Sequence, residues 1–115
     1  MKRLDSHAIG VDQGDVILFS DFEDDGEMWK GEGPRSARRT ITFSDRFADV
    51  PSISLQMSMI DMSNDAFIRA DLQAEDVSDA GFDIVFRTWG DSRVARIRVA
   101  WQAIGPLPSD DAWEL

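Results

Sequence analysis

The strongest constraint on the fold is a period-two alternation that runs twice through residues 81–104, on either side of a short polar stretch. The alternating apolar side chains are Phe82, Ile84 and Phe86 in the first run, and Ile97, Val99 and Trp101 in the second. A period of two places such side chains on one face of a β-strand. Residues 89–93, Trp-Gly-Asp-Ser-Arg, lie between the runs, and their Gly-Asp-Ser core suits a reversal. The segment therefore predicts two strands and a tight connection.

Further short apolar or alternating runs are separated by turn signals at intervals of roughly 8 to 12 residues. They cover residues 15–20, 35–43, 52–61 and 66–77. The last run is the hardest to assign because Ala, Leu, Gln and Glu also favour a helix, and the turn signals close on both sides decide for a strand. About six strands without a helical pattern predict an all-β antiparallel sandwich or barrel, and 115 residues suit a single domain.

The organisation along the chain is predicted from changes in composition. Residues 1–34 are expected to form an N-terminal arm, a short strand and a loop that pack on the sandwich. Residues 35–105 are expected to form the sandwich itself, and residues 106–115 an acidic tail. Within residues 1–14, an arm packed on a neighbour and a loose tail are equally compatible with the sequence.

Two apolar residues of the acidic, glycine-rich loop at residues 22–34 are expected to close one end of the core. They are Met28 and Trp29. In the tail, Trp113 is a candidate for docking on the surface or on a partner.

Charge and composition exclude several classes of partner and site. The chain has no cysteine and a single histidine, His7, which argues against thiolate or histidine metal sites and against a histidine-based triad. A formal net charge of −10 disfavours nucleic acid and anionic membrane surfaces. No apolar run approaches the roughly 20 residues of a membrane span. No signal peptide is visible, so a cytoplasmic location or a non-standard export route is expected.

Carboxylates are the only plentiful catalytic groups, and their placement favours a solvated surface. Pairs such as Asp24–Asp25 and Asp110–Asp111 could in principle perform glycoside hydrolysis, but they cluster in loops and in the tail. Residues 22–27, FEDDGE, offer oxygen ligands beside a glycine, as a calcium site would, but they lack the spacing of a calcium-binding EF-hand loop. We therefore interpret this segment as a solvated loop. We therefore expect no catalytic residue, no metal and no cofactor.

A binding surface is the remaining interpretation. Sugars are recognised by an aromatic face against the ring, by carboxylates that accept from hydroxyl groups and by arginines that donate to oxygens. The sequence offers Trp89 at the start of the connection, Arg69 in the middle of a predicted strand beside Asp71, and Glu32 between two glycines.

These residues belong to an ordered set of motifs over residues 39–104 that resembles the H-type lectin domain family, the family of snail agglutinins and of the discoidin C-terminal domain. The motifs are RTITFSDRF followed by Pro51, SISLQMSMIDM, the triplet Phe67-Ile68-Arg69, VSDAGF, RTWGDSRV and VAWQAI. They occur in the family's order and at near-identical spacing. The resemblance implies a six-stranded antiparallel β-sandwich that forms a homotrimer, with a hexamer as the alternative, and binds a galactose or N-acetylgalactosamine glycan at protomer edges without a metal.

The resemblance also implies a sugar-binding set. The strand arginine of the family falls on Arg69, its tryptophan on Trp89 and its loop acid near Glu32, and the turn residues Gly90 and Asp91 complete the predicted site. Two positions depart from the snail lectin, because Gly90 replaces a histidine and Ala95 replaces an aromatic residue.

A purely structural role remains an alternative to sugar binding for each of three residues. Arg69 would pair with Asp71 or with an acid on the neighbouring strand, Trp89 would lie in a trimer interface or in the core, and Glu32 would be a solvated loop acid. The alternative function is a non-catalytic trimerisation or adaptor module of a larger surface or appendage assembly. Arg96 and Arg98, on the outer face of the last strand, would meet acids near a trimer axis or face water.

Overall fold

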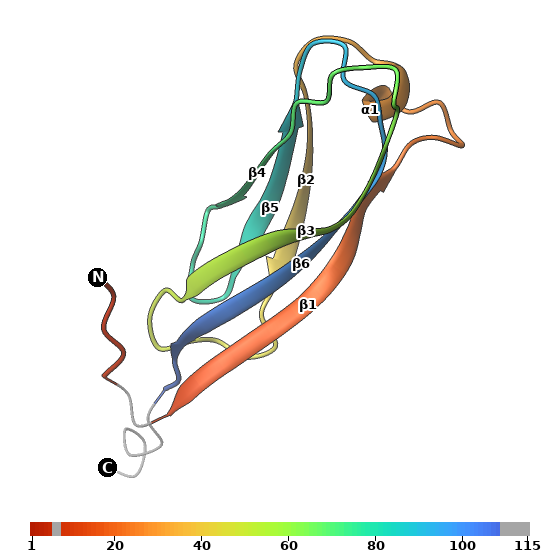
Figure 1. The fold of residues 1–115 in the computed structure, drawn as a ribbon. Coiled ribbons are helices and arrows are strands. Elements are labelled where there is room, and N and C mark those ends of the chain that lie inside the picture. Colours follow the sequence, from red (N-terminus) through yellow and green to blue (C-terminus); the bar gives the residue numbers. More distant parts are fainter. Residues whose placement is uncertain (6–7, 109–115) are drawn as a thin grey trace.

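The computed structural model describes residues 1–5 and 8–108 and contains six β-strands and one short α-helix. The strands are β1 (Ile9–Ser20), β2 (Arg35–Thr42), β3 (Ser52–Met62), β4 (Asp71–Glu75), β5 (Gly81–Thr88) and β6 (Val94–Pro106), with α1 (Glu27–Lys30) between β1 and β2. Every strand pairing is antiparallel. The predicted all-β, six-stranded antiparallel sandwich is confirmed (Figure 1).

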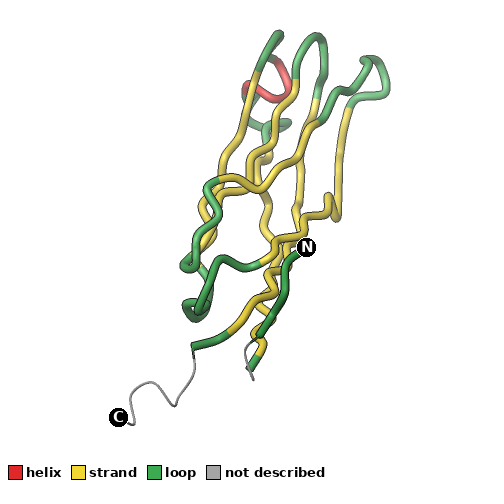
Figure 2. The backbone as a smooth tube through the Cα atoms, turned by 90° about the vertical axis from the view of Figure 1, so that its left-hand side faces the viewer, coloured by secondary structure: helices red, strands yellow, loops and turns green. Residues whose placement is uncertain are grey.

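The two sheets have three strands each, in the orders β1-β6-β3 and β2-β5-β4. The two alternating runs of the sequence are therefore the central strands of opposite sheets, and the connection at residues 89–93 crosses from one layer to the other. Figure 2 shows the two layers from the side, with α1 at one end among the connecting loops. This crossing places the polar connection at the end of the sandwich rather than along one sheet.

The core lies between the inner faces of β5 and β6. Its fully enclosed members include Phe82, Ile84, Phe86, Ile97 and Val99. Trp101 packs edge-on against Phe82, with ring centroids 5.6 Å apart. The period-two pattern therefore predicted the inward faces of both central strands correctly.

Of the two residues of the loop before β2 that were expected to close one end of the core, Met28 does so and Trp29 does not belong to the core cluster. Met28 in α1 is buried with 3% of its surface exposed and belongs to the core cluster. Trp29 packs edge-on against Phe22, with centroids 5.0 Å apart, and the Arg93 guanidinium lies 5.3 Å from the centre of its ring. The single turn of helix was not expected from the sequence.

β1 begins at Ile9, whereas the sequence predicted a strand only from Asp15. The first part of β1 pairs with the end of β6, from Ile9 opposite Pro106 to Gly14 opposite Trp101. A Cβ atom at Gly14 would lie 3.0 Å from the Trp101 indole nitrogen, so the glycine allows the ring to pack on the backbone. A glycine that looked like a strand breaker is thus a packing site.

β4 is shorter than predicted, because it begins at Asp71 rather than at residue 66. Arg69 consequently precedes the strand instead of lying in its middle, in the irregular segment at residues 63–70 that follows β3. His7, Trp113 and the Asp110–Asp111 pair, which the sequence analysis discussed, lie outside the described residues.

Candidate functional site

Three irregular segments meet at the α1 end of the sandwich, and Arg35 joins them. Arg35 is only 4% exposed. Its Nε donates to the carbonyl oxygen of Gly33 at 3.0 Å, Nη1 donates to those of Glu27 at 3.2 Å and Met28 at 3.3 Å, and Nη2 donates to that of Gly90 at 3.2 Å. One guanidinium therefore holds α1, the loop at residues 31–33 and the connection at residues 89–93 in a fixed arrangement.

The loop that carries Glu32 is also tied to the connection directly. The backbone N–H of Gly33 donates to the carbonyl oxygen of Gly90 at 2.9 Å. Glu32 itself is exposed, and both it and Asp91 line one pocket. The predicted loop acid and the predicted turn acid therefore lie on the same small surface.

Arg69 reaches the same connection from a further segment, the irregular stretch before β4. Its Nη1 lies 2.6 Å from Asp91 Oδ1 and 3.1 Å from the Phe67 carbonyl oxygen, and donates to both. The hydrogen bond from Arg69 lowers the pKa of the Asp91 carboxyl below its usual value. The carboxylate and the guanidinium form a charged pair that still has free donors and acceptors at the surface, where the side chains are 61% and 37% exposed.

Gly90 permits the close approach of Arg69. Its backbone lies in the left-handed region, with φ +68°, and a Cβ atom there would lie 2.9 Å from Arg69 Nη1. The Arg69 guanidinium thus occupies the space that a side chain at position 90 would need.

Ser92, which is fully buried, fixes the backbone of this region. Its hydroxyl oxygen accepts from the Arg69 backbone N–H at 2.9 Å, and the hydroxyl lies 2.9 Å from the Trp89 carbonyl oxygen, to which it can donate. On the other side, the hydroxyl of Thr88 donates to the Arg69 carbonyl oxygen. Two short hydroxyl side chains therefore lock the irregular segment before β4 against the end of β5.

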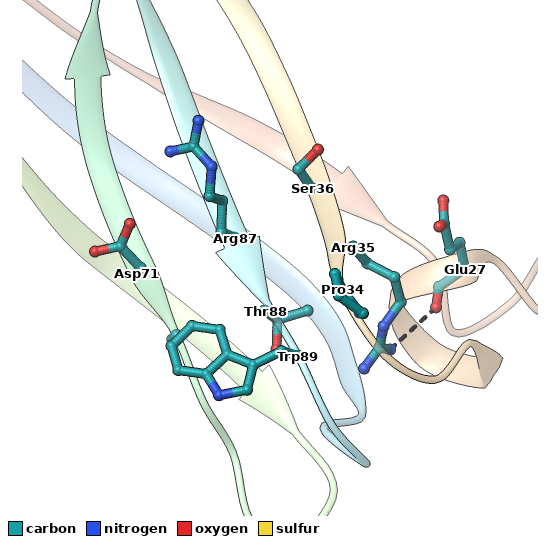
Figure 3. Close-up of a pocket in the computed structure, with 9 residues that line it drawn as sticks. Glu27, Pro34, Arg35, Ser36, Asp71, Arg87, Thr88 and Trp89 are labelled. Atoms are coloured by element: carbon teal, nitrogen blue, oxygen red, sulfur yellow. Dashed lines mark hydrogen bonds between the residues drawn. The ribbon is translucent and has the colours of Figure 1, made fainter.

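Two pockets flank the connection. The smaller, which we call the Glu32 pocket, has a volume of about 290 Å³ and is lined by Lys30, Gly31, Glu32, Asp65, Ala66, Asp91 and Arg93. The larger, which we call the Trp89 pocket, has a volume of about 690 Å³ and is shown in Figure 3. It is lined by Glu27, Pro34, Arg35, Ser36, Ala70, Asp71, Arg87, Thr88 and Trp89.

The structure thus brings four of the five predicted sugar-binding residues to one place and separates the fifth. Glu32 and Asp91 line the Glu32 pocket. Arg69 lies beside it, because its guanidinium donates to Asp91 and packs against Gly90. Trp89, which is 45% exposed, lines the Trp89 pocket instead and is not a core residue.

The alternative pairing of Arg69 with Asp71 is wrong. Asp91 takes that role because the connection folds back over Arg69.

Two residues that organise the site carried little sequence signal. Arg35 looked like part of a cationic strand start, and Ser92 like an ordinary turn residue. Each also contacts a backbone group distant in the chain, the Gly90 carbonyl oxygen for Arg35 and the Arg69 N–H for Ser92, and such backbone partners leave no periodic or motif signature. Locally, the sequence shows only that Arg35 follows the Gly33-Pro34 pair and begins a strand. Neither feature indicates which groups its guanidinium binds.

Within residues 1–5 and 8–108, no group of three or more His, Cys, Asp or Glu side chains is arranged to hold a metal ion. In the same part of the chain, no helix has the length and apolar character needed to span a membrane.

Comparisons with known proteins place this geometry in context. A family model described as the H-type lectin domain matches residues 38–104. A protein of Fuscovulum blasticum described as ATP synthase subunits region ORF 7 is 47% identical over 115 residues, which is 100% of this chain and 99% of that protein. Discoidin-2 of Dictyostelium discoideum is 28% identical over 81 residues, 70% of this chain but 32% of its own length.

Solved structures show the same fold. Recombinant native discoidin II of Dictyostelium discoideum has a TM-score of 0.74 at 23% identity, covering 91% of this chain and 40% of that chain. The wild-type discoidin II structure gives the same score and identity, covering 90% of this chain and 39% of that one. The chain therefore spans less than half of the discoidins that it matches.

Proposed function

Since the chain belongs to the H-type lectin domain family, we propose that it is a carbohydrate-binding module for glycans that end in galactose or N-acetylgalactosamine. The observation that carries the proposal is the ion pair of Arg69 with Asp91, whose carboxylate lines the Glu32 pocket together with Glu32. A guanidinium beside carboxylates supplies donors and acceptors to vicinal sugar hydroxyls, and each such charge-assisted bond is stronger than a neutral one.

The module acts without catalysis. The matched family and the structural neighbours support a binding role, because the family is one of lectin domains and the neighbours are discoidins. The Asp91 carboxyl also supports it, since the hydrogen bond from Arg69 lowers its pKa, whereas a general acid requires a raised pKa.

A homotrimer with sites at the protomer edges is the proposed assembly, and the outer face of the β1-β6-β3 sheet is its candidate interface. Three cross-strand rows of this face carry one charged side chain, Asp15. The rest of these rows, which we call the neutral face, consists of Val11, Gln13, Ser52, Ser54, Gln56, Ala100, Gln102 and Ile104. In a chain of net charge −10, a nearly uncharged sheet face is where copies approach with the least repulsion.

The other sheet is a poorer candidate for self-association. The outer face of β2-β5-β4 carries an ion-pair network in which Arg38 contacts Asp83 at 2.6 Å and Glu75 at 3.0 Å, while Arg87 contacts Glu75 at 2.6 Å. Burying this network against a second copy would require desolvating all of these charges.

Arg96 and Arg98 border the neutral face. Arg96 pairs with Asp61 at 3.2 Å. Arg98 donates to the Ser58 hydroxyl at 3.0 Å and, among the described residues, has no carboxylate within salt-bridge distance. Arg98 is therefore the residue available to an acid of a neighbouring protomer.

The sugar proposal is tested by titration. Galactose and N-acetylgalactosamine are added to tens of millimolar while backbone amide NMR signals of residues 90–92 are followed. The wild type is expected to show saturable shifts with a dissociation constant near the millimolar range, and Arg69→Ala is expected to abolish them because it removes about 1.5 to 3 kcal/mol of charged hydrogen bonding. The control is Arg46→Ala, which removes an exposed arginine that pairs with Asp79 and lines neither pocket.

A structural adaptor is the second candidate, and two observations favour it. Arg69 already satisfies Nη1 through Asp91 and Phe67. Ala95, which replaces an aromatic residue, is 3% exposed and offers nothing to a ligand. Absence of any shift with either sugar, in a protein that still self-associates, would favour the adaptor.

A further inference from the structure

We propose that the Trp89 pocket is a second sugar subsite, which takes a neutral pyranose ring adjacent to the terminal sugar of a glycan. The inference rests on the proposed function, and it extends the ligand from a single sugar to an oligosaccharide. No residue of the predicted site other than Trp89 lines this pocket.

The pocket is built by three neighbouring strands. Ser36 of β2, Arg87 of β5 and Asp71 of β4 form one cross-strand row, with Arg87 on the central strand. Figure 3 shows the Trp89 ring on the same side as Asp71, with Ser36 and Arg35 across the pocket. Arg87 and the neighbouring Thr88 thus form the floor, and the two outer strands form the walls.

The size and the side chains suit a sugar ring. A volume of about 690 Å³ falls within the range of about 300 to 1,000 Å³ that is typical of small-molecule sites. The exposed indole of Trp89 offers a flat face, and no hydrogen bond links the Asp71 carboxylate to any described residue. Ser36 adds a hydroxyl that can donate and accept. An aromatic face beside an unengaged acceptor is the pattern that binds a polyhydroxylated ring.

The charge of the lining indicates a neutral ligand. Two carboxylate residues, Glu27 and Asp71, face two guanidinium residues, Arg35 and Arg87. Arg35 is engaged by four carbonyl oxygens, and Arg87 by Glu75 at 2.6 Å. Both cations are held by hydrogen bonds to other groups, whereas Asp71 acts on Arg87 only through its charge. An acidic sugar would therefore meet the Asp71 carboxylate without a guanidinium free to pair with it.

The two pockets adjoin each other through the backbone. Asp91 lines the Glu32 pocket, whereas Trp89, two residues earlier, lines the Trp89 pocket. Glu32 likewise lines the Glu32 pocket, and Pro34, two residues later, lines the Trp89 pocket. Arg69, which holds Asp91, is followed directly by Ala70 and Asp71 of the Trp89 pocket. Three segments thus contribute to both pockets, and the proposal is that one glycan spans the two.

The Trp89 pocket also stays open in the proposed trimer. It lies on the outer face of the β2-β5-β4 sheet, whereas the neutral face belongs to the β1-β6-β3 sheet.

The test compares monosaccharides with neutral di- and trisaccharides that end in galactose or N-acetylgalactosamine, using calorimetry on the full chain. At least one oligosaccharide is expected to bind about tenfold tighter than its terminal monosaccharide, the gain from one added charged hydrogen bond. Asp71→Asn and Ser36→Ala are expected to remove most of this gain while monosaccharide affinity stays unchanged. Gln73→Ala, on the exposed face of the same strand β4 but outside the pocket, is the matched control.

The outcomes separate the two proposals. If monosaccharides bind but no oligosaccharide binds tighter, or if the gain survives both pocket variants, the second subsite is overturned and the sugar-binding function stands. If carboxylate-bearing glycans gain more than neutral ones, the assigned ligand class is wrong. If neither monosaccharides nor oligosaccharides bind, the proposed function itself fails. Melting temperatures of the variants confirm that each has folded.

Discussion

At the scale of single residues, two glycines have left-handed backbones, but only one of them contacts a site residue. Comparing them distinguishes the effect of backbone strain from that of a lost contact. Gly90 has φ +68° with Arg69 against it, whereas Gly33 has φ +75° with nothing within 4 Å of a Cβ position. Gly90→Ala and Gly33→Ala are both expected to lower the free energy of unfolding by about 1 to 2 kcal/mol, since L-residues resist this conformation. Only Gly90→Ala is expected also to weaken sugar binding, because it displaces the guanidinium. Urea denaturation and sugar titration of both variants measure the difference. Equal sugar affinities would contradict the role assigned to Arg69.

Arg35 is the residue whose loss should disturb the end of the sandwich most. Arg35→Met removes four hydrogen bonds from a buried guanidinium to carbonyls of three segments. We expect the free energy of unfolding to fall by about 2 to 4 kcal/mol, because bonds to charged groups are strong and the carbonyls lose their partner. Equilibrium urea unfolding measures this effect.

The control for Arg35 is Arg46→Met, which removes one exposed ion pair at 3.3 Å to Asp79. Surface changes of this kind usually stay within about 0.5 kcal/mol. A similar loss in both variants would mean that Arg35 does not organise the site.

At the scale of the elements, the ion-pair network across β2, β5 and β4 makes stability depend on pH. Arg87 and then Arg38 lower the pKa of Glu75, and the Thr40 hydroxyl followed by Arg38 lowers that of Asp83. A carboxyl whose folded pKa is depressed stabilises the fold above its unfolded pKa, near 3.9 for Asp and 4.3 for Glu, and that contribution is lost as pH falls through the folded value.

The melting temperature is therefore expected to fall as the pH decreases from about 5 towards 3, where these carboxyls begin to protonate. Arg38→Met should reduce the size of this fall, because it removes a partner of both carboxylates. Arg39→Met, on the same strand with a single bond to the Ile17 carbonyl oxygen, should leave the pH dependence unchanged. Parallel pH curves for the wild type and Arg38→Met would show that the network does not couple to pH.

At the scale of the whole molecule, assembly depends on the neutral face. Gln102 lies in its central row, between Gln13 and Ser54. Gln102→Glu keeps the shape of the side chain but places like charges near one another in a trimer, so we expect a shift from trimer to monomer in solution mass measured by light scattering. Gln73→Glu is the matched change on the outer face of the other sheet and should leave the mass unchanged. A wild type that is already monomeric at micromolar concentration would contradict the proposed assembly.

Local sequence pattern determined most of the fold. Phe82, Ile84 and Phe86, together with Ile97 and Val99, predicted two strands with one buried face each, because a strand's side chains alternate whatever it pairs with. The family resemblance likewise followed from the order of local motifs, and the family model confirms it. Met28 as a plug at the end of the core was correct for the same reason, since a large apolar side chain in a polar loop must be buried somewhere.

Only the tertiary structure decided what these elements do together. It placed the two alternating strands in opposite sheets, extended β1 to Ile9 through pairing with β6, and began β4 at Asp71. It paired Arg69 with Asp91, and it placed Trp89 and Glu32 in different pockets. These features depend on which strands pair and on carbonyl groups that Arg35 gathers from distant segments. Such contacts are non-local and largely with the backbone, so the identities of neighbouring residues do not encode them.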